Sequence, residues 1–450
     1  MNFYKPLFLT AFLFALSCGQ SVPKPTYFSS PEKINTIVDQ FVENEGFPLL
    51  YVRLENEEGT VLYEHDAVNR NHLPEEEISG DTWFRIWSMS KIITISLLLD
   101  LVEDGLVQLN DPIEKFIPEF KDLKVAVAEN DESLATYARE YFKNSSGFSG
   151  EYLNNSKISD ATCPIRLVNN KNTITVLDLI NHQAGFYYAT TPFRCLNEML
   201  AEEDFNAMTT NQEIINSMAK MPLVMHAGTE DFYGTNTTVL GFVAERASGK
   251  TLEELLNERI KIPLGIKGLR YKKTADINLL PTFSGKDSLL RKATKGELDI
   301  LGANIPNYDE DNQVFLGGEG MIGTAKGYAA FLRMLMNHGE LNGHRFLDEA
   351  SVRDMYAPHT QLDNDWGYNG YNLWITSNKH LTLGYGDAGL WTGGGYEQTH
   401  FWVDPKRKFV GVIMTQMFDI PPQGMNRDNL IRGAMYQQIF EKEQTKLNKK

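Results

Sequence analysis

An apolar pattern between Ser88 and Asp104 predicts a buried helix in the body of the chain. From Ile92 onward nearly every position is apolar, so no polar stripe marks a face toward water. Gly105 follows at once, and glycine is common directly after a helix. A helix that is apolar on all sides has to be buried, and we therefore expect only its first turn to face a cavity.

Two patterns nearer the start of the chain predict a surface helix followed by a β-hairpin. Ser30 is suited to the N-cap of a helix and Pro31 to its first turn. The sequence PLLYVRLENEEGTVLYEHDA then places two β-rich runs around a turn at Asn56–Gly59. The helix would bury one face through apolar residues at helical spacing, which are Ile34, Ile37, Val38, Phe41 and Val42.

The middle of the chain differs in pattern from its end. Residues 106–310 indicate mostly helices and loops, and an acidic stretch rich in Asn and Ser, 124–170, is interpreted as an insertion because it has little periodicity. β character returns in YNLWITSN, YEQTHFWVD and KFVGVIMTQM, before a closing helix over 426–442. Strands at both ends predict one sheet built from both termini, with helices on its faces and a helical domain inserted between.

These patterns predict one folded domain at 30–442. Its α/β part comprises 30–90 and 312–442, and its mainly helical part comprises 91–311. Ligand sites commonly lie where two such parts meet, so we expect the active site in the groove between them.

The first residues have the pattern of an export signal. Lys5 precedes an apolar stretch at 7–16, which is too short to cross a bilayer. We interpret 1–17 as a signal peptide and 18–29 as a polar tether. Cys18 follows a small residue, as in the cleavage box of bacterial lipoproteins, and would carry a lipid anchor in the periplasm or cell envelope. The alternative is a plain signal peptide with an incidental cysteine.

Composition excludes some classes of function. The chain has 450 residues, of which 42% are hydrophobic, as in ordinary globular proteins. Its net charge of −16 argues against a nucleic-acid partner, because phosphate binding needs a surplus of lysine and arginine. Apart from Cys18 there are two cysteines, Cys163 and Cys195, which have no metal-ligand company nearby and would be able to pair in an exported protein.

The pattern Ser-x-x-Lys occurs four times, and its surroundings sort the copies. Three copies have ordinary explanations. Ser21-x-x-Lys24 lies in the tether, Ser30-x-x-Lys33 caps the first helix, and Ser217-x-x-Lys220 lies in the last turn of a helix that ends before a proline. The fourth copy, Ser88-x-x-Lys91, begins the buried helix. Only this copy stands where a shielded cavity is expected.

The position of Ser88 and Lys91 suits nucleophilic catalysis without histidine. Residues three apart on a helix lie on one face, so the hydroxyl and the amine can reach hydrogen-bonding distance. The field at a helix N-terminus favours negative charge on the serine oxygen, and the same field, with burial, disfavours an ammonium. A neutral lysine is then able to accept the serine proton.

With these residues in place, the chain resembles the penicillin-recognising serine hydrolases, which include class C β-lactamases, D-alanyl peptidases and related family VIII esterases. Beside Ser-x-x-Lys, the resemblance over 30–442 is carried by GLVQLNDPIEKFIPEF, ITVLDLINHQAGF, KIPLGI, GGEGMIGTAKGYAAFLRMLMNHGELNGHRFL and HFWVDPKRKFVGVIMTQ. It implies a three-layer α/β fold, an antiparallel sheet flanked by helices with an inserted mainly helical domain. It implies neither a metal nor another cofactor, and gives His182 a structural place.

The family's second motif is built on a tyrosine, usually as Tyr-x-Asn. HAGTEDFYGTNTTVLGFVAERASGK places Tyr233 at the matching position, and the resemblance gives it a general-base and proton-relay role beside Lys91. The residue two further along is Thr235, and Asn236 comes one position late. Loss of the asparagine is typical of the esterase branch.

The third motif is a strand segment, Lys-Thr-Gly in lactamases and often Trp-x-Gly in esterases. GLWTGGGYEQ supplies Trp391 and Gly393, and the family pattern makes the N–H of Gly394 the partner of the Ser88 N–H in an oxyanion hole. Trp391 replaces a cation that binds carboxylates, so the resemblance favours uncharged esters or amides as small-molecule substrates.

The resemblance predicts a serine hydrolase that forms an acyl-enzyme on Ser88, and it favours the esterase form; the N-terminal pattern adds the expectation that this hydrolase is exported. The other hypothesis is a non-catalytic or slowly acylating penicillin-binding sensor of the same fold, supported by Thr235. A formal dinucleotide fingerprint, Gly384-x-Gly386-x-x-Gly389, leads into a strand rather than a helix and is rejected.

Overall fold

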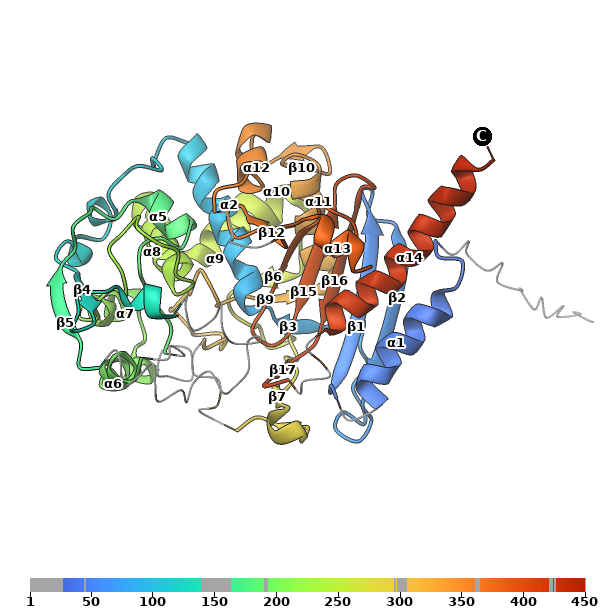
Figure 1. Ribbon diagram of the computed structural model, residues 1–450, viewed down its shortest axis with the longest axis horizontal. Helices are drawn as coiled ribbons and strands as arrows, with labels where there is room; N and C mark the ends of the chain where they lie inside the picture. Colours follow the sequence, from blue (N-terminus) through green and yellow to red (C-terminus); the bar gives the residue numbers. More distant parts are fainter. Residues whose placement is uncertain are drawn as a thin grey trace, which may run out of the picture.

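A seven-stranded antiparallel sheet, built from both ends of the chain, forms the centre of the protein (Figure 1). The computed structural model describes residues 27–43, 46–138, 163–189, 193–294, 297, 306–360, 365–420, 424 and 426–449. The strands stand in the order β12-β13-β14-β15-β16-β1-β2. They are β12 (Gly367–Asn369), β13 (Trp374–Thr376), β14 (Trp391–Gly394), β15 (His400–Asp404), β16 (Phe409–Met414), β1 (Leu49–Asn56) and β2 (Val61–Val68).

The predicted hairpin is confirmed as β1 and β2, with Gly59 at a φ of +84° in the turn, where glycine is favoured. Strand β1 pairs on its other side with β16, so Tyr51 lies opposite Met414. The first and last parts of the chain therefore share one sheet, as the sequence pattern predicted.

Helices cover both faces of this sheet and make the fold three-layered. On one face lie α1 (Pro31–Glu43) and α14 (Arg427–Leu447), which pack side by side (Figure 1). Tyr63 on β2 donates a hydrogen bond to Asn35 of α1. On the other face lies α11 (Ala325–Met336), whose Arg333 pairs with Glu55 of β1. The closing helix extends to Leu447, beyond the predicted 442.

The remaining elements form a mainly helical part beside the sheet and small additions to it. Helix α2 (Ser90–Glu103) runs between the two parts, and 12 of its 14 residues are buried, which confirms the predicted core helix. The others are β3 (Trp83–Arg85), β4 (Lys124–Val127), β5 (Arg166–Asn169), α5 (Val176–Ile180), α6 (Arg194–Ala201), α7 (Asn211–Met218), α8 (Asn236–Ser248), α9 (Leu252–Leu255), α10 (Ile262–Leu264), β6 (Leu269–Arg270), β7 (Phe283–Ser284), β8 (Arg291–Lys292), β9 (Ile322–Thr324), β10 (Glu340–Leu341), β11 (His344–Arg345), α12 (Glu349–Met355), α13 (Asn378–Thr382) and β17 (Met417–Phe418).

Several predictions from the sequence concern segments that lie wholly or partly outside the described residues. Cys18, the signal peptide and most of the tether lie outside them, as does 139–162 of the proposed insertion. The described ends of that insertion pair as β4 and β5. A disulfide joins Cys163 to Cys195, which the sequence left open. Among the helices that the structure describes, none is both long and apolar enough to span a bilayer.

Candidate active site

The residues around Ser88 form a tight turn that leads into α2. A short 3-10 helix, Trp87–Met89, precedes the α-helix, which begins at Ser90 and not at Ser88 as the pattern suggested. Trp87 has a φ of +45°, in the left-handed region that side chains rarely occupy. Its indole donates a 2.9 Å hydrogen bond to Glu397, in the loop between β14 and β15. This contact holds the turn against the end of β14.

The structure brings Ser88, Lys91 and Tyr233 together at this turn. Lys91 Nζ lies 3.1 Å from Ser88 Oγ, and the hydroxyl of Tyr233 donates to the same Oγ at 2.8 Å. Lys91 is fully buried, whereas Tyr233, from the loop before α8, is 51% exposed. The lysine also lies 5.0 Å from the centre of the Tyr233 ring. The serine hydroxyl therefore has a basic group on the buried side and a phenol on the solvent side.

Two residues that the sequence patterns did not indicate complete the surroundings of Lys91. The hydroxyl of Tyr188 lies 3.0 Å from Lys91 Nζ, and Glu319 Oε1 lies 3.4 Å from it. Tyr188 also donates a hydrogen bond to Glu319. Burial, followed by the charge of Glu319, raises the pKa of Tyr188 well above its ordinary value of 10.0. Tyr188 thus remains a phenol and a hydrogen-bond donor.

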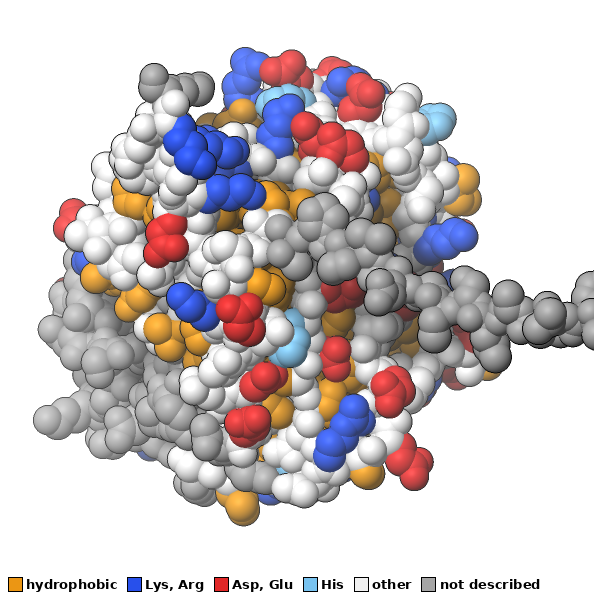
Figure 2. Space-filling model, turned by 90° about the vertical axis from the view of Figure 1, so that its right-hand side faces the viewer, with side chains coloured by type: hydrophobic (Ala, Val, Ile, Leu, Met, Phe, Trp, Pro, Cys, Tyr) orange, Lys and Arg blue, Asp and Glu red, His pale blue; other side chains and the backbone are white. Residues whose placement is uncertain are grey.

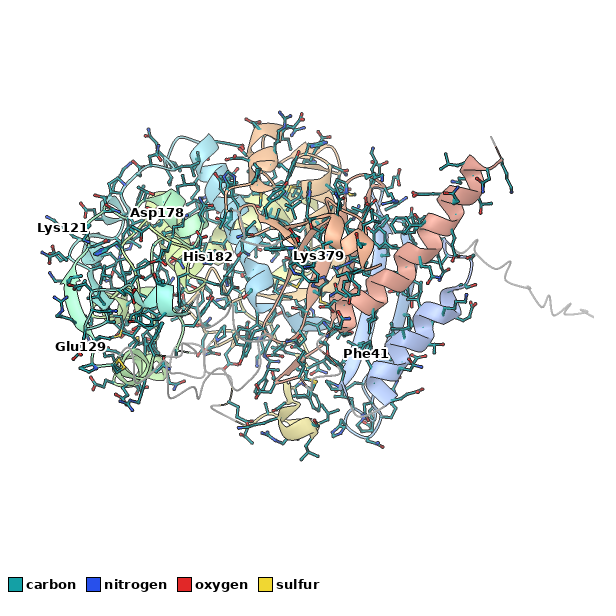
Figure 3. The ribbon with its side chains drawn as sticks, viewed as in Figure 1. Phe41, Lys121, Glu129, Asp178, His182 and Lys379 are labelled. Carbon is teal, nitrogen blue, oxygen red and sulfur yellow. A yellow bond between two sulfur atoms is a disulfide. The ribbon has the colours of Figure 1, made fainter. Side chains whose placement is uncertain are left out.

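His182 supports Tyr233 from beneath. The two rings stack at 4.8 Å, and His182 contacts Asn236 through Nδ1 and Asn372 through Nε2, each at 3.2 Å. Burial, followed by the nearby charge of Lys91, lowers the pKa of His182 to about 3. The imidazole is therefore neutral at ordinary pH. The view of side chains places it near the middle of the molecule (Figure 3).

The asparagine that is one position late in the second motif serves this histidine. Asn236 is fully buried and directs its amide to His182 and to the carbonyls of Phe186 and Phe232. Thr235, at the usual asparagine position, donates to the carbonyl of Tyr187. The shifted asparagine therefore contacts His182, which in turn stacks on Tyr233.

Strand β14 lies next to the turn at Ser88. A Cβ placed on Gly395 would come within 2.4 Å of the carbonyl oxygen of Ile86, so the two backbones meet there. Within the strand, Gly394 pairs with His400, and a Cβ on Gly393 would reach the Phe401 ring at 2.6 Å. Glycines permit this close packing. The oxyanion-hole role of Gly394 remains a prediction.

Trp391 is buried beside the site. Its side chain is 4% exposed and stacks on Tyr356, with ring centres 4.6 Å apart and an angle of 18°. The ring therefore supports the wall of the site more than it lines it.

Other candidate sites have local explanations. The hydroxyl of Ser217 and the amine of Lys220 both bind Glu203, at 2.6 and 2.9 Å, which confirms that this Ser-x-x-Lys copy is a helix end. Over the described ranges no group of three His, Cys, Asp or Glu residues is arranged to hold a metal.

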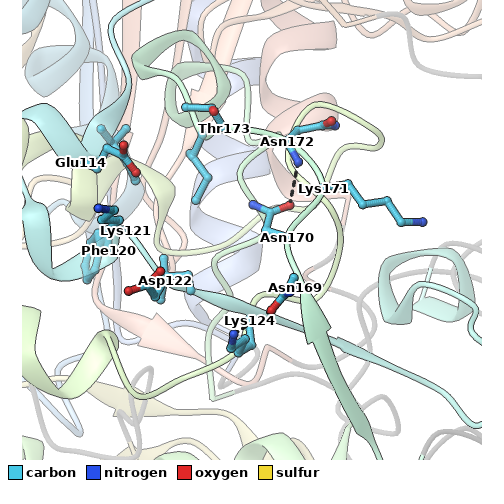
Figure 4. A pocket seen from close by; sticks show the side chains of 13 residues that line it. Glu114, Phe120, Lys121, Asp122, Lys124, Asn169, Asn170, Lys171, Asn172 and Thr173 are labelled. Carbon is cyan, nitrogen blue, oxygen red and sulfur yellow. Dashed lines mark hydrogen bonds between the residues drawn. The ribbon is translucent and has the colours of Figure 1, made fainter.

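A polar hollow lies elsewhere, beside the β4–β5 pair (Figure 4). Lys121, Asp122 and Asn169 are among its lining residues, and Asn170 accepts a hydrogen bond from the backbone of Asn172. Figure 3 shows Lys121 at the outer end of the helical part, away from His182. The hollow is therefore separate from the Ser88 site.

The chain belongs to the family described as Beta-lactamase, whose family model matches residues 34–434. It is 26% identical to ML-236A carboxylate methylbutanoyltransferase of Penicillium citrinum over 72% of this chain and 66% of the relative. It is 24% identical to lovastatin esterase of Penicillium rubens over 72% of this chain and 77% of the relative.

The structure of simvastatin synthase (LovD) from Aspergillus terreus superposes with a TM-score of 0.68 at 19% identity, covering 91% of this chain and 98% of that one. The family thus comprises serine hydrolases and acyltransferases, esterases among them, and the expected fold is confirmed.

Proposed function

We propose that this protein is a serine hydrolase that cleaves small-molecule esters through an acyl-enzyme on Ser88. One observation carries the proposal: Ser88 Oγ lies within hydrogen-bonding distance of both Lys91 Nζ and the Tyr233 hydroxyl. A hydroxyl is a weak nucleophile until a neighbouring base removes its proton. The buried amine of Lys91 can accept the serine proton, and the exposed phenol of Tyr233 can pass a proton to the leaving group.

The steps follow from these positions. Ser88 Oγ attacks the carbonyl carbon while its proton passes to the neutral amine of Lys91. The C–O bond to the alcohol breaks, and the alcohol oxygen receives a proton relayed from Lys91 through Tyr233, which faces solvent. A water molecule then attacks the acyl group, gives its proton back along the same path and releases the acid and free Ser88.

The negative charge on the carbonyl oxygen needs donors that are already in place. We assign this role to the backbone N–H groups of Ser88 and Gly394, supported by the contact between the Ser88 turn and the end of β14. Trp391 stands where lactamases have a lysine, which favours uncharged esters over penicillin-like acids.

Transfer of the acyl group to an alcohol is a second candidate, favoured by the similarity to a methylbutanoyltransferase. It uses the same acyl-enzyme, with an alcohol in place of water. An added alcohol that raises the rate of acyl-enzyme breakdown and appears in a new ester would demonstrate it.

The proposal is tested with a fluorophosphonate probe and two substrates. Wild-type protein should be labelled and should cleave a short-chain nitrophenyl ester far faster than a chromogenic cephalosporin. Ser88→Ala should lose labelling and at least about 1,000-fold of the ester activity. Ser217→Ala removes the serine of another Ser-x-x-Lys pair and should change neither.

An unlabelled, inactive wild type would instead favour the non-catalytic sensor. A cephalosporin cleaved faster than the ester would overturn the substrate assignment made from Trp391.

We also propose export, with lipid attachment at Cys18. The short apolar segment before that cysteine supports this. The Cys163–Cys195 disulfide adds support, because such bonds persist in oxidising compartments.

A further inference from the structure

We propose that Glu319 acts with Lys91 much as the carboxylate of a serine-protease triad acts with its histidine. In this assignment, which rests on the proposed function, Glu319 stabilises the ammonium that forms when Lys91 takes the proton of Ser88. Tyr188 is the hydroxyl that bridges the amine and the carboxylate.

The first support is the closeness and burial of the pair. Lys91 is 0% exposed and Glu319 is 2% exposed, and their charged atoms lie 3.4 Å apart. In the part of the chain that the structure describes, Glu319 pairs with no other cation. Because water does not screen a buried pair, each charge acts strongly on the other.

The second support is the set of donors around the carboxylate. Tyr188 donates to one oxygen of Glu319 and Thr238, from α8, donates to the other. Tyr188 keeps its proton because burial raises its pKa well above 10.0. These two hydrogen bonds hold the carboxylate of Glu319 in place beside the amine of Lys91.

The third support is that, among the described residues, the other groups that contact Lys91 carry no negative charge. They are the hydroxyl of Ser88, the phenols of Tyr188 and Tyr233, and the carbonyl of Gly318, which accepts from Nζ at 3.0 Å. His182, which stacks on Tyr233, is neutral because burial lowers its pKa to about 3.

The proton balance is simple. In the form of the enzyme that attacks, the proton is on Ser88 and the amine of Lys91 is neutral. After attack, the serine oxygen is bonded to carbon, the proton is on Lys91, and the new ammonium lies beside an unchanged carboxylate. The anion makes the amine a stronger base, and it also favours protonation of that amine in the resting enzyme.

These two effects give a signature that a purely structural role does not produce. Without the carboxylate, proton abstraction at the plateau should be slower. The acidic limb of the pH–rate profile should nevertheless move to lower pH, because the amine would hold its proton less tightly. A variant that merely contains less folded protein would show a lower plateau rate, but the pH midpoint of its acidic limb would be unchanged.

The experiment measures kcat/KM for a nitrophenyl ester from pH 4 to 9. In Glu319→Gln we expect a plateau at least about 10-fold lower and an acidic midpoint lower by about 1–3 pH units. Tyr188→Phe keeps the carboxylate and should lower the plateau with a smaller shift. Glu253→Gln is the matched control, since it breaks a Lys–Glu contact of 3.7 Å with Lys261 and should leave the midpoint unchanged.

An unmoved midpoint in an active, folded Glu319→Gln variant would overturn the role of Glu319. Should that variant not fold, Glu319→Ala is measured in the same way, with the pH dependence of fluorophosphonate labelling as a second readout. Failure of the proposed function looks different: the wild type would then show no Ser88-dependent activity at all.

Discussion

At the scale of single residues, the proposed site combines three groups to which we assign the proton transfers with a histidine that holds one of them in place. Ser88, Lys91 and Tyr233 contact one another directly. His182 lies under Tyr233 and is kept neutral by burial, so it supports the phenol without competing for protons. Because His182 carries no charge, it does not alter the charge around the Tyr233 hydroxyl.

The buried state of His182 predicts how stability depends on pH. Its pKa is about 3 in the folded protein against an ordinary value of 6.5, so its contribution is complete above pH 6.5 and is lost as pH falls toward 3. At pH 5 this effect lowers the free energy of unfolding by about 2 kcal/mol. We expect His182→Gln to be less stable at pH 7 but to lose about 2 kcal/mol less between pH 7 and pH 5.

Urea unfolding at the two pH values measures this difference. Equal losses in the variant and the wild type would show that His182 becomes protonated without opening the fold.

The sequence allowed Ser88, Lys91 and Tyr233 to be predicted, since two motifs mark them. Tyr188 and Glu319, 97 and 228 residues from Lys91, were missed because Tyr188 lies just beyond a stretch that carries the resemblance and Glu319 lies in one to which the resemblance gives no catalytic role. A glutamate between glycines gives no sign in the sequence that it is buried. Only the fold brings these side chains to the lysine.

At the scale of elements, the site depends on two backbones that meet edge to edge. The turn before α2 and the loop after β14 touch at Ile86 and Gly395, and the Trp87–Glu397 hydrogen bond fixes them there. The buried helix was predictable from its apolar pattern. The 3-10 turn before it was not, because it results from contacts with a loop more than 300 residues away.

This contact predicts a kinetic effect of Gly395→Ala. A Cβ 2.4 Å from the Ile86 oxygen would push β14 away from Ser88 and disturb the alignment of the two backbone N–H groups that we propose as oxyanion donors. We expect kcat to fall by about 100-fold while KM changes little, because the donors act mainly in the transition state.

Steady-state kinetics on the nitrophenyl ester check this. Gly327→Ala is a matched control, since its Cβ would clash 2.5 Å from the Gly268 oxygen, between α11 and the segment before β6. It should lower stability and leave kcat near the wild-type value. A similar kcat loss in both variants would contradict the alignment argument.

At the scale of the whole molecule, the site draws on both parts of the fold, because Gly395 follows a strand of the sheet and Tyr233 precedes a helix of the helical part. The surface view shows both acidic and basic side chains on this face of the molecule (Figure 2). The shape of the fold was predictable because sheet strands occur at both ends of the sequence. The 139–162 segment lies outside the described residues, so its part of the prediction stays a prediction.

Export and lipid attachment also concern the whole molecule. When the full chain is produced in bacteria fed an alkyne-labelled fatty acid, we expect label on the wild type and its recovery with membranes. Cys18→Ser should lose both, while Cys195→Ser should keep the label. Soluble, unlabelled wild-type protein outside the cytoplasm would favour a plain signal peptide.

The pairing of β1 with β16 has a consequence for how the protein is made. The two strands lie about 350 residues apart in the sequence, so the contact order of the central sheet is high. Until β16 has been synthesised, the edge of β1 that pairs with β16 in the folded protein stays unpaired. Assembly of the complete sheet is therefore a late event.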